Sequence, residues 1–182
     1  TGFVPGDRVA CTGGSGSGEF GTHTEMVFVP QNLVARIPDG VSYEEAAFAT
    51  LGSIALQGVR QAELRLGEYA AVVGLGLLGL ITVQLLKANG CHVIGMDVTD
   101  GNFELARKLG CDQCVLSDEG SVAAVEAFTR GNGTDAVLLT AATKSNEPMS
   151  RAMEFARPKS KVVVVGDVGL TIPRPLFFTK AI

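Results

Sequence analysis

The second part of the chain alternates short apolar runs with longer segments that have helical character. Strands are predicted over residues 69–73, 92–97, 113–116, 135–140 and 161–166, and helices over 77–88, 103–109, 122–129 and 149–156. The strand runs are almost continuously apolar, which is typical of strands covered on both faces. Strands that alternate with helices imply right-handed βαβ crossovers, so the pattern predicts an α/β fold with a doubly wound parallel sheet.

The first 66 residues have a different pattern. Extended pieces are predicted over 8–11, 24–30 and 33–38, with a Gly/Ser-rich loop over 13–18. Ser42 followed by Glu45 forms a capping-box pattern that starts a short helix, and a second helix is predicted over 53–62. The chain is therefore expected to divide at residues 1–40, 41–66 and 67–182, with an incomplete sixth strand starting at 177–182.

A glycine-rich turn links the first predicted strand of the sheet to the helix that follows it. Its glycines are Gly74, Gly76 and Gly79 in the pattern GxGxxG. The first allows a sharp turn, the second leaves room for a pyrophosphate, and the third lets the helix lie close to the strand. The backbone N–H groups of Leu77 and Leu78, at the start of the helix, would then face the phosphates. The alternative is a tight turn that binds nothing.

Asp97 ends the second predicted strand, about twenty residues after the glycines. A carboxylate at this place accepts hydrogen bonds from the adenosine ribose in dinucleotide-binding domains. It would repel a 2′-phosphate, and residues 98–102 contain no arginine or lysine. The sequence therefore predicts NAD as the cofactor, in preference to NADP.

Composition excludes several other classes. Net charge is −4 and there is no long basic stripe, which argues against nucleic acid as a partner. Residues 69–86 are uncharged and approach membrane-spanning length, but the three glycines of the turn divide them into a buried strand and a buried helix. The four cysteines are too few for a secreted disulfide framework. With no signal peptide at the start of the chain, we expect a cytoplasmic protein without a membrane span.

Several motifs, in order along the whole chain, resemble medium-chain dehydrogenases of the zinc-type alcohol dehydrogenase branch. They begin at Gly6 (GDRV), Glu25, Val29 (VP), Ile37 (IPDG), Glu44 (EEAA), Gly74 (GLGLLG), Leu109 (LGCD) and Gly133 (GTDAV). The segment 48–60 is also similar to bacterial two-part oxidoreductases. The resemblance implies a truncated member of the family: a remnant of the β-rich, GroES-like catalytic domain over 1–40, a helical connection, and an NAD-binding Rossmann domain over 67–182.

The same resemblance implies hydride transfer between a nicotinamide and an alcohol, polyol or carbonyl substrate. In zinc-dependent members two metal ligands match positions before Thr1, and the third falls near Ala49, where the sequence offers no good ligand. No zinc is therefore expected in this chain, and its catalytic residues are unknown. The chain alone is expected to be inactive.

Further cofactor-binding positions are carried over from the family. Thr140 and Ala141 end the fourth predicted strand and should border the adenosine, and Gly166 ends the fifth and should border the nicotinamide ribose. Ser53 matches a family position near the nicotinamide.

The cysteine pair and the histidines can each be interpreted as chemical groups or as structural residues. Cys111 and Cys114 have the CxxC spacing of redox pairs, but they lie between a helix and a strand, so buried structural thiols are favoured. His92 is expected to be a surface or edge residue, and His23 is a weak candidate for a proton shuttle.

The sequence leaves two functional hypotheses. The favoured one is the cofactor-binding portion of an NAD-dependent oxidoreductase, because residues 1–66 match the approach to a dehydrogenase cofactor domain. The alternative is a non-catalytic NAD(H)-binding or sensing module. An uncovered strand at the sheet edge predicts a homo-oligomer, most simply a dimer. The identity of the small-molecule substrate is not encoded in any motif.

Overall fold

The computed structural model describes residues 2–12 and 25–182. The chain divides into two compact units, Thr1–Ser53 and Ile54–Ile182. The predicted Gly/Ser loop and His23 lie outside the described residues. Helix α2 (Ala49–Ala62) begins in the first unit and continues in the second, starting four residues before the predicted 53.

The first unit contains a small antiparallel ribbon. Strands β1 (Val9–Cys11) and β2 (Val34–Arg36) pair directly, and a short 3₁₀ helix, η1 (Gln31–Leu33), leads into β2. The described part of the extended segment predicted over 24–30 forms no strand. Helix α1 (Tyr43–Ala46) follows.

The predicted capping box is confirmed at α1. The Ser42 hydroxyl accepts from the Glu45 N–H at 3.1 Å, and the Glu45 carboxylate accepts from the Ser42 N–H at 2.8 Å. Because each side chain satisfies a backbone donor that has no partner inside the helix, this four-residue helix starts at a fixed position.

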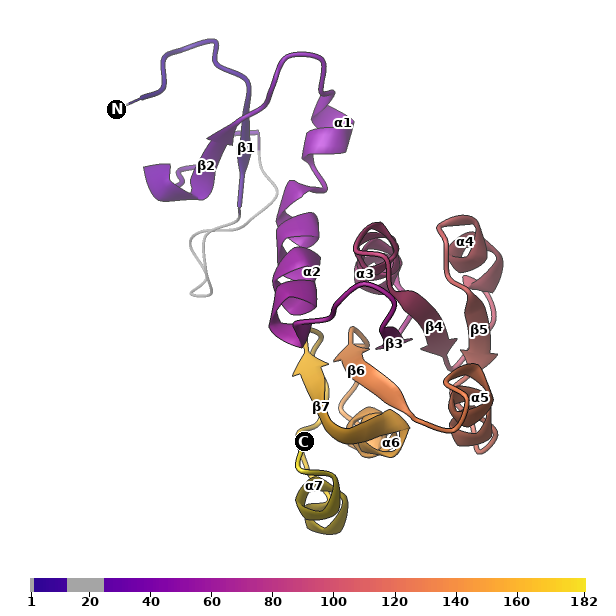
Figure 1. Ribbon diagram of the computed structural model, residues 1–182. Coiled ribbons are helices and arrows are strands. Elements are labelled where there is room, and N and C mark those ends of the chain that lie inside the picture. The colour runs from indigo at the N-terminus through magenta and orange to yellow at the C-terminus, as the bar shows by residue number, and fades with distance from the viewer. Residues whose placement is uncertain (1, 13–24) are drawn as a thin grey trace. The chain divides into compact units, whose positions relative to one another are not determined.

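The second unit is a five-stranded parallel sheet flanked by helices (Figure 1). The strands are β3 (Tyr69–Val73), β4 (His92–Asp97), β5 (Gln113–Leu116), β6 (Thr134–Leu139) and β7 (Ala156–Val164). Their spatial order is β5-β4-β3-β6-β7, so the chain builds the sheet in one direction from β3 and then returns to build it in the other. The two directions part between β3 and β6, where an open α/β sheet forms a crevice.

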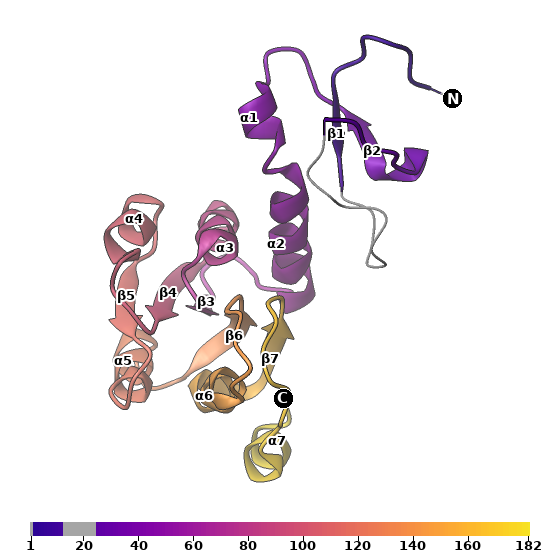
Figure 2. The same cartoon turned by 180° about the vertical axis from the view of Figure 1, so that it is seen from behind.

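Helices cover both faces of this sheet, as Figure 2 shows from behind. Apolar residues of α2, α3 (Leu77–Ala88) and α4 (Phe103–Lys108) pack on one face, and those of α5 (Ser121–Phe128) and α6 (Glu147–Phe155) on the other. Strand β3 supplies both cores, because Ala70 and Val72 face one and Ala71 and Val73 face the other. The predicted doubly wound parallel sheet is confirmed.

The uncharged run 69–86 is shared between β3 and α3, which meet at the glycine turn. In the described parts of the chain no helix has the length and apolar character needed to cross a membrane.

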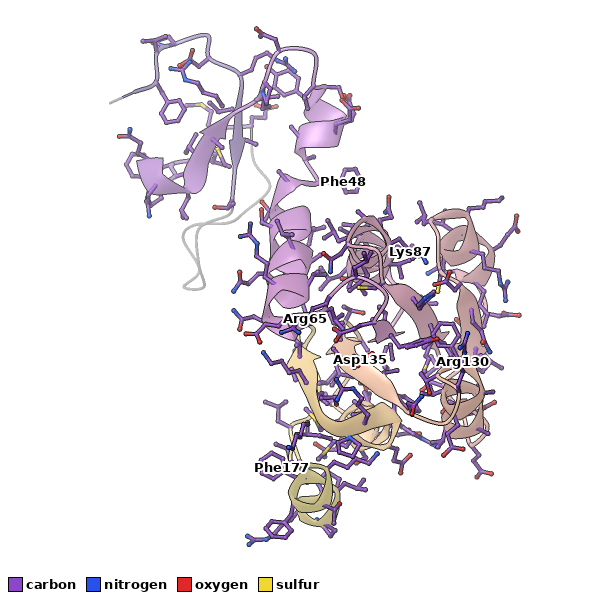
Figure 3. The ribbon with its side chains drawn as sticks, in the orientation of Figure 1. Phe48, Arg65, Lys87, Arg130, Asp135 and Phe177 are labelled. Atoms are coloured by element: carbon purple, nitrogen blue, oxygen red, sulfur yellow. The ribbon has the colours of Figure 1, made fainter. Side chains whose placement is uncertain are left out.

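Asp135, which is labelled in Figure 3, joins β3, β6 and β7 at their amino ends. Its carboxylate accepts from the Tyr69 N–H at 2.8 Å and from Arg157 Nε at 2.6 Å. The Tyr69 ring stacks on His92, with ring centroids 5.0 Å apart. The prediction of His92 as an exposed strand-end residue is confirmed. Polar ties therefore fix the amino ends of these strands, while their carboxyl ends lead into the loops of the crevice.

The C-terminal segment differs from the sequence-based expectation. Of residues 177–182, predicted to start a sixth strand, the first four lie in helix α7 (Arg174–Lys180). Pro173 and Pro175 explain the difference, because proline fixes φ near the helical value and is well tolerated in the first turn, where its missing N–H costs nothing.

Lys180 attaches α7 to the end of α6. Its ammonium donates to the carbonyl oxygens of Met153, Glu154 and Ala156 at 2.8–2.9 Å. These are among the last carbonyls of a helix, which have no partner within it, and a cation near them is favoured by the helix dipole.

We expect Lys180→Met to lower the free energy of unfolding by about 1 kcal/mol, because the methionine keeps the apolar stem and loses the donors. Lys108→Met is a matched control, since Lys108 pairs with Glu104 on an exposed helix surface. Urea denaturation of both variants measures the difference. Equal losses would show that the bonds to the end of α6 contribute nothing specific.

Candidate functional site

A cleft of about 690 Å³ opens at the carboxyl ends of the strands, in the crevice between β3 and β6. All of the predicted cofactor-binding residues line it except Gly79 and Ser53. The lining residues come from the glycine turn and from the segments that follow β4, β5, β6 and β7: Val73, Gly74, Gly76, Leu77, Leu78, Asp97, Val98, Ser117, Thr140, Ala141, Ala142, Thr143, Ser145, Glu147, Pro148 and Gly166.

Each glycine of the turn meets a different requirement. Gly74 has a φ of +100°, which side chains rarely adopt. A Cβ at Gly79 would overlap the carbonyl oxygen of Gly74, so α3 can lie this close to β3 only with glycine there. A Cβ at Gly76 would meet nothing within 4 Å and would project into open space beside the cleft. The turn thus combines two glycines that the fold needs with one that leaves space free.

Asp97 is tied directly to the glycine turn. Its Oδ2 accepts from the Leu75 N–H at 2.7 Å, and its Oδ1 accepts from the Val98 N–H at 2.7 Å. Sequence reasoning assigned Asp97 only to ribose recognition and missed this bond. No local signal could have revealed it, because Leu75 and Asp97 meet only when β3 and β4 pair side by side.

The ends of β6 and β7 close the other side of the crevice. The Thr140 hydroxyl donates to the Gly74 carbonyl oxygen at 2.6 Å, and Ala141 lies directly against Gly74. Gly166 packs so closely on Ala141 that a Cβ would overlap its carbonyl oxygen. Thr140 and Ala141, which follow β6, therefore lie against the glycine turn, and Gly166, which follows β7, packs on Ala141.

Four polar residues of the cleft were missed from the sequence: Ser117, Thr143, Ser145 and Glu147. Ser117 follows β5, Thr143 and Ser145 belong to the segment between β6 and α6, and Glu147 is the first residue of α6. The general rule that ligands gather at the carboxyl ends of parallel strands pointed to these segments. It could not say which side chains turn inward.

Among the described residues, the charged side chains that line the cleft are both acidic, Asp97 and Glu147. Glu147 also forms a long ion pair with Arg151, at 3.6 Å. No lysine or arginine of residues 2–12 and 25–182 lines the cleft. Positive potential for an anion would come from the start of α3, where the first backbone N–H groups have no partner within the helix.

Ser53 belongs to the other compact unit, and its hydroxyl donates to the Ala49 carbonyl oxygen at 2.8 Å. Its predicted place near a nicotinamide stays a prediction.

Cys111 and Cys114 are both buried, as the structural reading predicted. Burial, together with the neighbouring Cys114, raises the pKa of the Cys111 thiol to about 12. A thiol that stays protonated at neutral pH is a poor nucleophile. The pair therefore packs the core behind the glycine turn.

Among residues 2–12 and 25–182, no three His, Cys, Asp or Glu side chains come together in a way that could hold a metal ion. The described residues therefore do not fit a zinc site. The expectation that this chain binds no zinc stays a prediction.

The sequence comparison decides the family. Residues 78–181, more than half of the chain, match the family described as zinc-binding dehydrogenase. The chain belongs to the zinc-binding dehydrogenase family. The predicted resemblance is confirmed.

Curated relatives that match this chain include proteins named alcohol dehydrogenase. One from Geobacillus stearothermophilus is 32% identical over 87% of this chain and 47% of its own length. One from Rhizobium meliloti is 31% identical over 87% of this chain and 46% of its own length. The chain thus spans about half the length of the curated relatives it matches.

Solved structures of the family have the same fold. The alcohol dehydrogenase of Thermus sp. ATN1 matches with a TM-score of 0.80 and 30% identity, covering 88% of this chain and 49% of that one. A putative zinc-binding dehydrogenase from Sinorhizobium meliloti 1021, bound to NADP, has a TM-score of 0.73 and 24% identity, covering 84% and 46%. At that identity the second likeness shows the fold alone.

We expect Gly79→Ala to destabilise the protein by about 1–3 kcal/mol, because the turn must move to admit the methyl group. Gly76→Ala, the matched control, should cost at most about 1 kcal/mol, the effect of alanine at a helix N-cap. Urea unfolding compares them. A Gly79→Ala variant as stable as Gly76→Ala would contradict the close contact of α3 with the turn.

Thiol labelling tests the structural reading of the cysteines. Ellman's reagent at pH 8 should react quickly with the exposed Cys11 and, only after unfolding, with the buried Cys91, Cys111 and Cys114. Cys11→Ser should remove the fast phase. Fast labelling of Cys114 in the folded Cys11→Ser variant would contradict the structural role and favour a redox pair of Cys111 and Cys114.

Proposed function

We propose that this chain binds NAD(H) in the cleft and forms the cofactor-binding portion of a dehydrogenase. The observation that carries the proposal is the single cleft in which the glycine turn, Asp97 and the ends of β6 and β7 meet. These four parts lie far apart in the sequence, and a dinucleotide is a ligand long enough to contact all of them. A turn that only connected a strand to a helix would not need open space at Gly76.

The lining residues suggest how the ligand would lie. The N–H groups at the start of α3 would hold the pyrophosphate, and the Asp97 carboxylate would accept from the adenosine ribose. Thr140 and Ala141 would border the adenosine, and Gly166 the nicotinamide ribose. When bound, the nicotinamide supplies or accepts the hydride, and the residues of this chain bind and orient it.

We propose NAD rather than NADP as the cofactor. A 2′-phosphate beside Asp97 would meet a like charge, and none of the described residues that line the cleft is basic and could offset the repulsion. The NADP bound in the Sinorhizobium meliloti structure is a ligand of that protein. In this chain the charge pattern favours the unphosphorylated ribose.

For the whole protein we propose hydride transfer between the nicotinamide and an alcohol, polyol or carbonyl substrate. The support is the family and the names of its curated relatives, of which this chain spans about half. Self-association, expected because β7 lies at the edge of the sheet, stays a prediction.

Titration with NADH and, separately, NADPH tests the proposal. Nicotinamide fluorescence reports binding, and NADH at a hundredfold over its Kd should stabilise the second unit by about 2.7 kcal/mol. NADH should bind at least about tenfold more tightly than NADPH, a difference of about 1.4 kcal/mol. Equal affinities would refute the preference for NAD, and no binding of either would refute the proposed cofactor site.

Two Asp97 variants separate charge from structure. Asp97→Asn removes the charge, keeps an acceptor oxygen for the Leu75 N–H and gives up the bond to the exposed Val98 N–H. It should therefore reduce the preference for NADH over NADPH while the Leu75 contact is kept. Asp97→Arg should reverse the preference, because a guanidinium pairs with the 2′-phosphate. If both variants leave the NADH-to-NADPH ratio unchanged, Asp97 does not face the ribose.

A further inference from the structure

Asn102 lies at the N-cap of α4 but does not cap its own helix. Asparagine at this position ordinarily accepts a hydrogen bond from a backbone N–H of the first turn. Here the side chain makes no such bond. Its Nδ2 instead donates to the carbonyl oxygen of Leu75, 27 residues earlier in the chain, at 2.9 Å. The Asn102 side chain is therefore bonded to the glycine turn and not to the first turn of α4.

The bond fixes the peptide unit that joins Leu75 to Gly76. In a planar trans peptide the C=O and the N–H point in opposite directions. When Asn102 holds the Leu75 carbonyl on one side, the Gly76 N–H is directed to the other. Gly76 lines the cleft, at the N-cap of α3. The Asn102 amide thus sets the direction of a donor at the place where an anion would bind.

The preceding peptide unit, between Gly74 and Leu75, is held at both ends. Its carbonyl oxygen accepts from the Thr140 hydroxyl at 2.6 Å, and its N–H donates to the Asp97 carboxylate at 2.7 Å. The Leu75 side chain is fully buried and lies against β4 at Gly95. Because the Gly74–Leu75 peptide is fixed, the Leu75–Gly76 peptide can rotate only if the Leu75 carbonyl moves. The Asn102 side chain restrains that carbonyl.

We infer that Asn102 is a positioning residue of the proposed dinucleotide site, which orients the Gly76 N–H toward the pyrophosphate. This inference rests on the proposed function and goes further, because it assigns anion affinity to a residue outside the glycine motif. Asn102 acts through Leu75 and does not line the cleft itself.

Asn102→Ser is the variant of choice. Serine is a good N-cap residue, so α4 keeps its start, but its side chain is too short to reach the Leu75 carbonyl. Asn132→Ser is the matched control, since Asn132 also donates from Nδ2 to a backbone carbonyl, that of Thr129 at 3.1 Å, at the opposite end of the sheet. Binding of NADH, ADP and adenosine is measured for both variants by calorimetry.

In Asn102→Ser we expect the affinities for NADH and ADP to fall together by about three- to tenfold, the equivalent of one side-chain hydrogen bond. Adenosine, which lacks the pyrophosphate, should bind as it does to the unchanged protein. Asn132→Ser should alter none of the three. Unchanged NADH affinity in Asn102→Ser, or an equal loss for adenosine, would overturn the inference.

A backbone amide spectrum separates this inference from the proposed function. If the unchanged protein binds neither NADH nor ADP, the proposed function fails, and the Gly76 amide still reports on Asn102. In Asn102→Ser that amide should shift and exchange its proton with solvent faster, whereas in Asn132→Ser it should not change. A Gly76 amide that is the same in all three proteins overturns the positioning role.

Discussion

The central position of β3 is the constraint on which the rest of the second unit depends. The strand is hydrogen-bonded to β4 on one side and to β6 on the other, and its residues contribute to the cores on both faces of the sheet. Because the chain leaves β3 in one direction and returns to its other side, the loops after β3 and β6 diverge and leave a crevice. The glycine turn is placed in that crevice by strand pairing.

The same pairing explains how a flexible sequence becomes a rigid turn. Glycines alone permit many conformations, and their backbone entropy opposes any single one. In this structure the turn is restrained from neighbouring elements: Asp97 at the end of β4, Asn102 at the start of α4 and Thr140 after β6. Because these restraints already order the turn, little conformational entropy is lost when a ligand binds, and a preorganised site gains affinity in this way. The motif therefore depends on residues that lie outside it.

The electrostatics of the cleft follow from the same arrangement. Asp97 and Glu147 line it, and the N-terminus of α3 is the favourable element for an anion. A site of this kind suits a ligand whose negative charge is concentrated at one point and whose remaining parts are neutral polar groups. The opposite end of the sheet carries the ion pair of Asp135 with Arg157, away from the cleft.

The sequence by itself determined the alternation of strands and helices, the capping box at Ser42, the glycine turn and the family. Each of these is encoded by local periodicity or by closely spaced residues, so neighbours in the chain suffice to predict them. Tertiary structure decided that the helix over 174–180 docks through Lys180 on the end of α6, that Ser117 and Glu147 line the cleft, and that Asn102 reaches Leu75. Those outcomes depend on contacts between segments distant in the chain, and side-chain direction at such contacts is set by packing and hydrogen bonding that no local pattern records.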